Sequence, residues 1–95
     1  MSAPDQPPYD ARAIANLLIR YGNEAGHPLT NLSLQKVLYF AHALFLREFD
    51  CPLVAGYFEA WELGPVHPLV YGEFKKYGAR KIDGYASRRI LGSAQ

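Results

Sequence analysis

The strongest constraint on how this chain folds is an apolar stretch of eighteen residues, Leu32 to Phe49, in which twelve side chains are hydrophobic. Thr30 or Asn31 stands just before it, and both are good N-cap residues for a helix. A helix that is apolar nearly all round is a central one, covered by neighbours on most sides. A membrane span is excluded, because each charge at the centre of a bilayer costs about 2.5–3.5 kcal/mol. Besides Ser33, the stretch carries five larger polar or charged groups: Gln35, Lys36, His42, Arg47 and Glu48.

The polar residues of this helix predict two different faces. With about 100° of rotation per residue, Gln35, Tyr39 and His42 form a ridge on the side that should be buried. A buried polar group without a partner costs about 1–3 kcal/mol, so something must satisfy the ridge. Two interpretations stay open: the ridge bonds to backbone groups of an adjoining loop, or it lines a groove where a partner supplies the bonds. Four polar residues within roughly 120° of one another predict the solvent-facing side: Ser33, Lys36, Arg47 and Glu48.

Shorter elements are expected around the central helix. A first helix is predicted from Asp10 to Asn23, with Asp10 as its N-cap, and a third from Pro68 to about Tyr77. The segment 53–61 alternates weakly and is read as a loop with a short extended part. The fold class is therefore mainly α: a small single-domain helical bundle around a central apolar helix, with a short extended segment near residues 53–61. The first helix is expected to bury an apolar stripe of Ile14, Leu17, Leu18 and Tyr21, and the third one of Leu69, Val70 and Phe74. Gly72 inside the third helix suggests close packing at that position.

Length and charge divide the chain into three parts. Ninety-five residues suffice for one domain, with a flexible, proline-rich lead-in over 1–9, a helical domain over 10–78 and a basic tail or partial extension over 79–95. From Lys75 onward the net charge is +5, against −4 for the rest and +1 for the whole. This end is either a solvated surface or a site for an anionic partner. Its basic residues are Lys75, Lys76, Arg80, Lys81, Arg88 and Arg89.

The residues that could carry chemistry do not form a catalytic or metal-binding pattern. Cys51 and the three histidines lack the spacing of a zinc site. A nucleophilic pair of Cys51 with His42 is disfavoured, because the neighbouring Asp50 opposes a thiolate. No phosphate-cradling glycine motif is present. We therefore expect no enzyme activity, no metal and no cofactor. One unpaired cysteine and the absence of a signal peptide favour a soluble, cytoplasmic binding module.

Two motifs resemble a known family. The stretch Leu34–His42 reads L-Q-K-V-L-Y-F-A-H, and Phe58–Tyr71 reads F-E-A-W-E-L-G-P-V-H-P-L-V-Y. Both resemble, in the same order and spacing, the signatures of the Panacea or antitoxin SocA-like domain of bacteria and phages. The resemblance covers roughly 11–78, about two thirds of the chain.

The resemblance implies a mainly helical antitoxin of a type II toxin–antitoxin system, which binds and neutralises a cognate protein toxin. One family member acts as a proteolytic adaptor that delivers its toxin to the protease ClpXP. The alternative is a nucleic-acid-binding transcriptional regulator that uses the basic end, from Lys75 to Arg89. Matching positions and the polar ridge give these expected partner-binding residues, with Gly64 and Pro65 as a structural turn: Gln35, Lys36, Tyr39, His42, Trp61, Val66, His67 and Tyr71.

Overall fold

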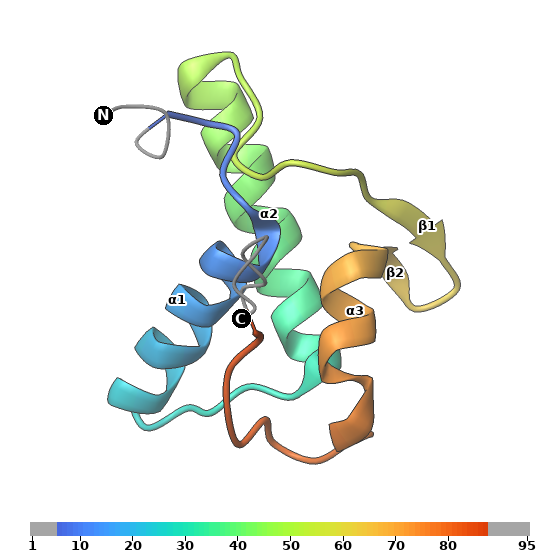
Figure 1. The fold of residues 1–95 in the computed structure, drawn as a ribbon. Helices are drawn as coiled ribbons and strands as arrows, with labels where there is room; N and C mark the ends of the chain where they lie inside the picture. The colour runs from blue at the N-terminus through green and yellow to red at the C-terminus, as the bar shows by residue number, and fades with distance from the viewer. Residues whose placement is uncertain (1–5, 88–95) are drawn as a thin grey trace.

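The computed structural model describes residues 6–87, and within them the fold is mainly helical, as expected (Figure 1). The helices are α1 (Ala11–Glu24), α2 (Asn31–Phe49) and α3 (Pro68–Phe74), and a 3₁₀ turn, η2 (Lys75–Tyr77), follows α3. Strands β1 (Glu59–Trp61) and β2 (Gly64–Val66) form an antiparallel hairpin. Within this part of the chain no helix has the length and hydropathy needed to cross a bilayer. Residues 1–5 of the predicted lead-in, with Arg88 and Arg89 of the basic end, lie outside the described residues.

The first two of the three predicted helix starts are confirmed by side-chain caps. The Asp10 side chain accepts a bond from the Arg12 N–H at 2.8 Å, which satisfies a free amide in the first turn of α1. Thr30 caps α2 together with Ser33, because each side chain bonds the backbone N–H of the other. These bonds fix both helix starts to within a residue of the expected positions.

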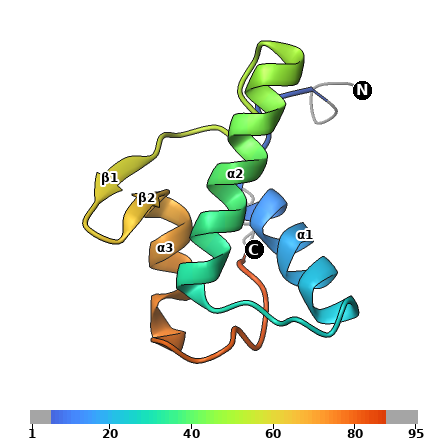
Figure 2. The ribbon, with the colours of Figure 1, turned by 180° about the vertical axis from the view of Figure 1, so that it is seen from behind.

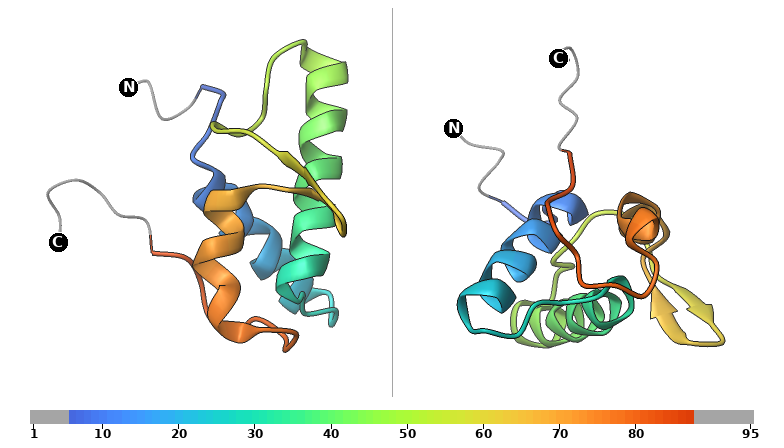
Figure 3. Two further views of the ribbon diagram at one scale, coloured as in Figure 1. Left: turned by 90° about the vertical axis from the view of Figure 1, so that its right-hand side faces the viewer. Right: turned by 90° about the horizontal axis from the view of Figure 1, so that it is seen from below.

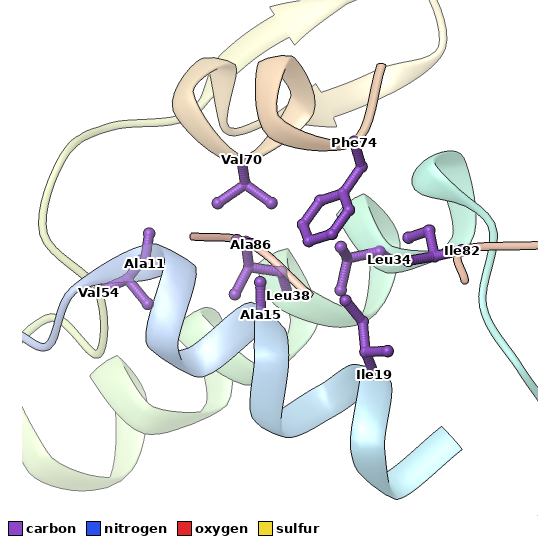
Figure 4. Packing of buried hydrophobic residues seen from close by; sticks show 10 residues of the cluster. All are labelled: Ala11, Ala15, Ile19, Leu34, Leu38, Val54, Val70, Phe74, Ile82 and Ala86. Atoms are coloured by element: carbon purple, nitrogen blue, oxygen red, sulfur yellow. The ribbon is translucent and has the colours of Figure 1, made fainter. Parts of the chain in front are cut away.

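The core lies where α1 and α3 meet the N-terminal half of α2 (Figure 4). From α1 it takes Ala11, Ala15 and Ile19, so the expected stripe is wrong for the centre of the buried face and for Tyr21. Tyr21 is exposed, while Ile14 and Leu18 pack only at the margin. The reason is steric, since two alanines on the buried face let the helix backbone come close to its neighbours. The other core residues come from α2, α3 and the loops: Leu34, Leu38, Val54, Val70, Phe74, Ile82 and Ala86.

The segment after η2 belongs to the packed unit. It returns between α1 and α3 (Figure 3), and the Ile82 side chain is only 4% exposed. The Ile82 N–H donates to the Leu29 carbonyl at 2.8 Å. Asn16 holds Ala86 through two bonds, of 3.0 Å to its carbonyl and 2.7 Å from its N–H. Packing therefore continues beyond Gly78, into the part of the chain that the sequence predicts to be a basic tail or a partial extension.

Helix α2 is central, but it is not covered on most sides, so that expectation is wrong. Its C-terminal half projects beyond α1 and α3 (Figures 1 and 2). At 1.5 Å per residue α2 is about 28 Å long, whereas α1 reaches about 21 Å and α3 about 10 Å, too short to cover it. Exposed apolar side chains remain along α2: Val37, Tyr39, Phe40, Leu44, Leu46 and Phe49.

The hairpin and α3 also differ from the sequence-based expectations. Gly64 and Pro65 lie in strand β2, where they pair with Trp61 and Ala60 rather than forming only a turn. In α3, Leu69 is exposed and not part of the inner stripe. Gly72 faces open space, because a Cβ there would meet no atom within 4 Å. Close packing at Gly72 is therefore wrong, and the short α3 buries only Val70 and Phe74.

Candidate partner-binding surface

A buried polar cluster connects α2 to the hairpin and α3. Gln35 is 1% exposed, and its Nε2 donates to Asn31 Oδ1 at 3.2 Å. Its Oε1 accepts the His67 N–H at 2.9 Å. The Asn31 side chain in turn donates to the Tyr71 carbonyl at 3.0 Å. For Gln35 the first interpretation is thus confirmed: the chain's own backbone satisfies this part of the ridge, and it does so just where β2 passes into α3.

His67 fixes the loop that leads into the hairpin. Its ring is 2% exposed, and Nε2 lies 2.9 Å from the Ala55 carbonyl oxygen. Because that oxygen can only accept, Nε2 carries the proton and Nδ1 is left as an acceptor. Nδ1 is buried without a partner among residues 6–87. Gly56 lies against the ring at φ +92°, and a Cβ there would come within 2.7 Å of Nε2.

An aromatic cluster continues from His67 to the exposed side of α2. The Phe58 ring centroid lies 5.2 Å from that of Tyr39, 5.1 Å from His42 and 5.2 Å from His67. His42 Nδ1 accepts the Val54 N–H at 3.4 Å. Burial lowers the pKa of His42, and repulsion from the protonated form of nearby His67 lowers it further. Within the ridge, Gln35 and His42 thus find hydrogen-bond partners in the chain itself, whereas Tyr39 stays exposed.

A second aromatic contact joins the hairpin to α3. The Trp61 and Tyr71 rings meet edge to face, with centroids 5.0 Å apart. The indole N–H of Trp61 donates to Glu59 Oε1 at 2.7 Å, which holds the ring on the outside of β1. Beside the pair lies a hollow of about 290 Å³. Its walls come from the N-terminus of α2, the hairpin tip and the end of η2: Thr30, Asn31, Leu32, Leu63, Tyr71, Gly78 and Ala79.

The expected partner-binding residues separate into two groups. Three lie inside the molecule, where they hold the hairpin on α2, so direct contact with a partner is not expected of them: Gln35, Val66 and His67. The others reach the surface, with His42 and Tyr71 half-buried: Lys36, Tyr39, His42, Trp61 and Tyr71. Within the structural turn, Gly64 adopts φ +119°, which a side chain would disfavour.

The sequence analysis missed the exposed apolar residues between the charges of α2. Phe40 is 64% exposed, although it lies on the side predicted to be polar. Val37 and Leu44 share that side. The signal was available, because Phe40 follows Lys36 by four residues and so points nearly the same way.

The described residues contain no group of three or more His, Cys, Asp or Glu side chains placed to hold a metal ion. Cys51 is a half-buried free thiol. The surface formed by α2 and the hairpin is suited to binding, because its exposed aromatic side chains are held in place by buried hydrogen bonds beneath them. Such residues are typical anchors of protein–protein interfaces.

Comparison with known proteins adds a family match and a relative. The family model described as "Antitoxin SocA-like, Panacea domain" matches residues 34–91. The curated protein "Antitoxin SocA" of Caulobacter vibrioides (strain NA1000 / CB15N) is 48% identical over 87 residues. That alignment covers 92% of this chain and 46% of the relative, so the chain spans about half the length of that protein. No solved structure matches the chain significantly.

Proposed function

This chain belongs to the antitoxin SocA-like, Panacea domain family, and on that premise we propose that it is an antitoxin of a type II toxin–antitoxin system. It binds its cognate protein toxin in the cytoplasm and neutralises it. Neutralisation of this kind needs a tight, stoichiometric contact and no chemical step. That requirement suits a chain whose sequence carries no recognisable catalytic motif and whose described residues include no cluster placed to hold a metal ion.

The observation that carries the proposal is the apolar surface left open along α2 and the hairpin. Small soluble domains rarely expose a contiguous apolar patch above a few hundred Å² unless it is an interface. Aromatic anchors in such a patch often cost about 2 kcal/mol or more of binding energy when truncated. The contacts we propose are those of the predicted residues that reach the surface, chiefly Lys36, Tyr39, Trp61 and Tyr71. Gln35 and His67 act beneath them by keeping the hairpin in place.

A growth assay tests this proposal. The protein encoded by the neighbouring gene is induced in a bacterial host, with or without this chain. We expect arrest without the chain and growth with it, and weaker rescue by the variant Trp61→Ala. Tyr85→Ala is the matched control, because Tyr85 is an exposed aromatic residue outside the proposed surface. Failure of the wild-type chain both to bind that protein and to restore growth would remove the proposal.

The proposal includes a finer step, in which the chain passes the bound toxin to ClpXP. The support for this step is the family resemblance. In a purified system, ClpXP should degrade the toxin only when the chain is added. A toxin that stays intact under those conditions would limit the function to neutralisation by binding.

Binding to nucleic acid is the second candidate. Four exposed cations lie near η2, and two of them, Lys76 and Arg80, sit over the Tyr77 ring at 5.6 Å. Binding through them should weaken steeply with salt, because each phosphate contact releases a counterion. Duplex DNA that is not retained at low salt would exclude this candidate. The exposed cations are Lys75, Lys76, Arg80 and Lys81.

A further inference from the structure

We propose that the toxin docks an amphipathic helix with a row of carboxylates onto the outer face of α2. This inference rests on the proposed function and specifies the chemistry of the docking segment. The outer face consists of the exposed residues of α2 that lie on the opposite side of the helix from the buried Leu34 and Leu38, and Figure 2 shows α2 with no other element drawn over it. Its members are exposed: Lys36, Val37, Tyr39, Phe40, Leu44, Leu46 and Arg47.

Two cations run along the middle of this face. Lys36 and Arg47 are eleven residues apart, which is about three turns, so they point within about 20° of each other and lie about 16 Å apart along the axis. Phe40 and Leu44 fall on one side of that line, and Tyr39 and Leu46 on the other. All four apolar residues are exposed. The face is therefore two apolar rows with a positively charged row between them.

The cations need an anionic partner when the face is covered. Among residues 6–87 the ion pairs are Arg12 with Asp10 and Arg20 with Glu24, so neither Lys36 nor Arg47 is paired. A partner that buries the apolar rows also removes water from the cations between them. Removing water from an unpaired charge is unfavourable, and a carboxylate opposite each cation restores the lost interaction. A partner helix with acidic residues between apolar ones meets both requirements.

The same charges argue against a second copy of this chain as the occupant. If two α2 helices packed antiparallel about a two-fold axis through this face, Lys36 of one copy would lie opposite Arg47 of the other. Like charges would then meet in the middle of the contact. Glu48 cannot relieve them, because it lies about 100° further round the helix than Arg47. A helix in turn fits because the outer face of α2 is one exposed side of a long helix, and helices pack on such a face through their own ridges.

Charge reversal tests the inference with the neighbouring gene product as the probe, and calorimetry measures its Kd. The double variant Lys36→Glu/Arg47→Glu should weaken binding by about tenfold or more, and Phe40→Ala by about tenfold. The controls are Lys75→Glu/Lys76→Glu, an equal change of charge on η2, and Tyr21→Ala, an exposed aromatic residue on α1. Both should bind within about twofold of wild type. Circular dichroism verifies that every variant is folded.

The outcomes separate this inference from the proposed function. If the gene product binds the wild-type chain but Lys36→Glu/Arg47→Glu binds equally well, or the η2 control loses as much, the inference is overturned while the proposed function stands. If the gene product does not bind at all, synthetic helical peptides still test the face. A peptide with Glu in its central row should bind more tightly than the same peptide with Lys, and the double variant should invert that order. Equal binding of both peptides, or binding of neither, overturns the inference.

Discussion

Gly56 and His67 show how one pair of residues positions the hairpin. The His67 ring cannot move away from Gly56, because Nε2 bonds the Ala55 carbonyl and the ring packs edge-on against Phe58. The backbone of Gly56 is also left-handed, at φ +92°. Steric space and backbone conformation therefore both require glycine at this position.

Gly56→Ala should destabilise the fold for two reasons: alanine disfavours the left-handed backbone conformation, and its Cβ would clash with the His67 ring. Gly26→Ala is the matched control, since Gly26 has φ +79° but a Cβ there would meet nothing within 4 Å. Gly26→Ala should lower the free energy of unfolding by about 1 kcal/mol, and Gly56→Ala should lower it by about 1–3 kcal/mol more than that. Urea unfolding of both variants measures the difference. Equal costs would mean that the His67 ring moves freely and does not fix the loop.

His42 should make the stability of the chain depend on pH. Burial and then the charge of His67 lower its pKa in the folded state, so the unfolded chain binds more protons as the pH falls through the ordinary range for histidine. The free energy of unfolding should therefore be highest above about pH 7 and decrease between about pH 7 and 5.5. Thermal unfolding across this range measures it. His42→Asn should flatten the profile, whereas His27→Gln, in an exposed loop, should not; identical profiles for His42→Asn and wild type would contradict the assignment.

The sequence predicts the roles of some residues, namely those that depend on near neighbours in the chain, but it does not predict contacts between distant residues. The caps Asp10 and Thr30 were predictable, because capping depends on neighbours one to three residues away. The burial of Gln35 was also predicted from helical spacing. Its partner, the His67 N–H, is thirty-two residues away, so no local rule identifies it. The same applies to Ala55 and His67, whose contact exists only because the loop folds back across α2.

Among the elements, the long helix was predictable and its surroundings were not. The length and cap of α2 follow from eighteen residues of pattern. How much of it is covered depends on the lengths of α1 and α3, and α3 is only seven residues long. Strand β2 was missed because Gly64 and Pro65 are rare inside strands, and their pairing with β1 cannot be read from the local sequence. For α1, hydrophobic periodicity predicted a buried face made of the large apolar residues. It did not identify the alanines, which are the residues that pack most closely.

The exposed glycine in α3 provides a test of how marginal that helix is. Gly72 lies inside α3 with open space where a Cβ would be, and its φ is not in the left-handed region. Gly72→Ala should therefore stabilise the chain by about 0.5–1 kcal/mol, because alanine restricts the unfolded chain and favours the helix. Chemical denaturation measures the gain. A loss of stability would show instead that Gly72 is needed for packing, as its place in the sequence first suggested.

The assembled chain is closed by segments that have no helix or strand of their own. Tyr9 exchanges backbone bonds with Leu53 and Ala55, each at 2.8 Å, at one end. At the other end the segment through Ile82 and Ala86 fills the gap between α1 and α3 (Figure 4). A core this thin depends on such segments, because three helices in so small a chain bury little apolar surface by themselves. Sequence reasoning placed both outside the helical domain, since neither has a periodic pattern.

Ile82 should therefore be as important for stability as a residue of the helices. Ile82→Ala removes a side chain that is 4% exposed and belongs to the same core cluster as Leu34 and Phe74, so the change should lower the free energy of unfolding by about 2–5 kcal/mol. The backbone bond from Ile82 to Leu29 is kept in this variant, so the loss reports packing alone. Tyr85→Ala, three residues further along at an exposed position, should change stability by no more than about 0.5 kcal/mol. Equilibrium unfolding in urea compares the two. If both variants unfold at the same urea concentration as the wild type, residues 81–86 lie on the core without stabilising it, and the folded unit ends near Gly78 as the sequence alone suggests.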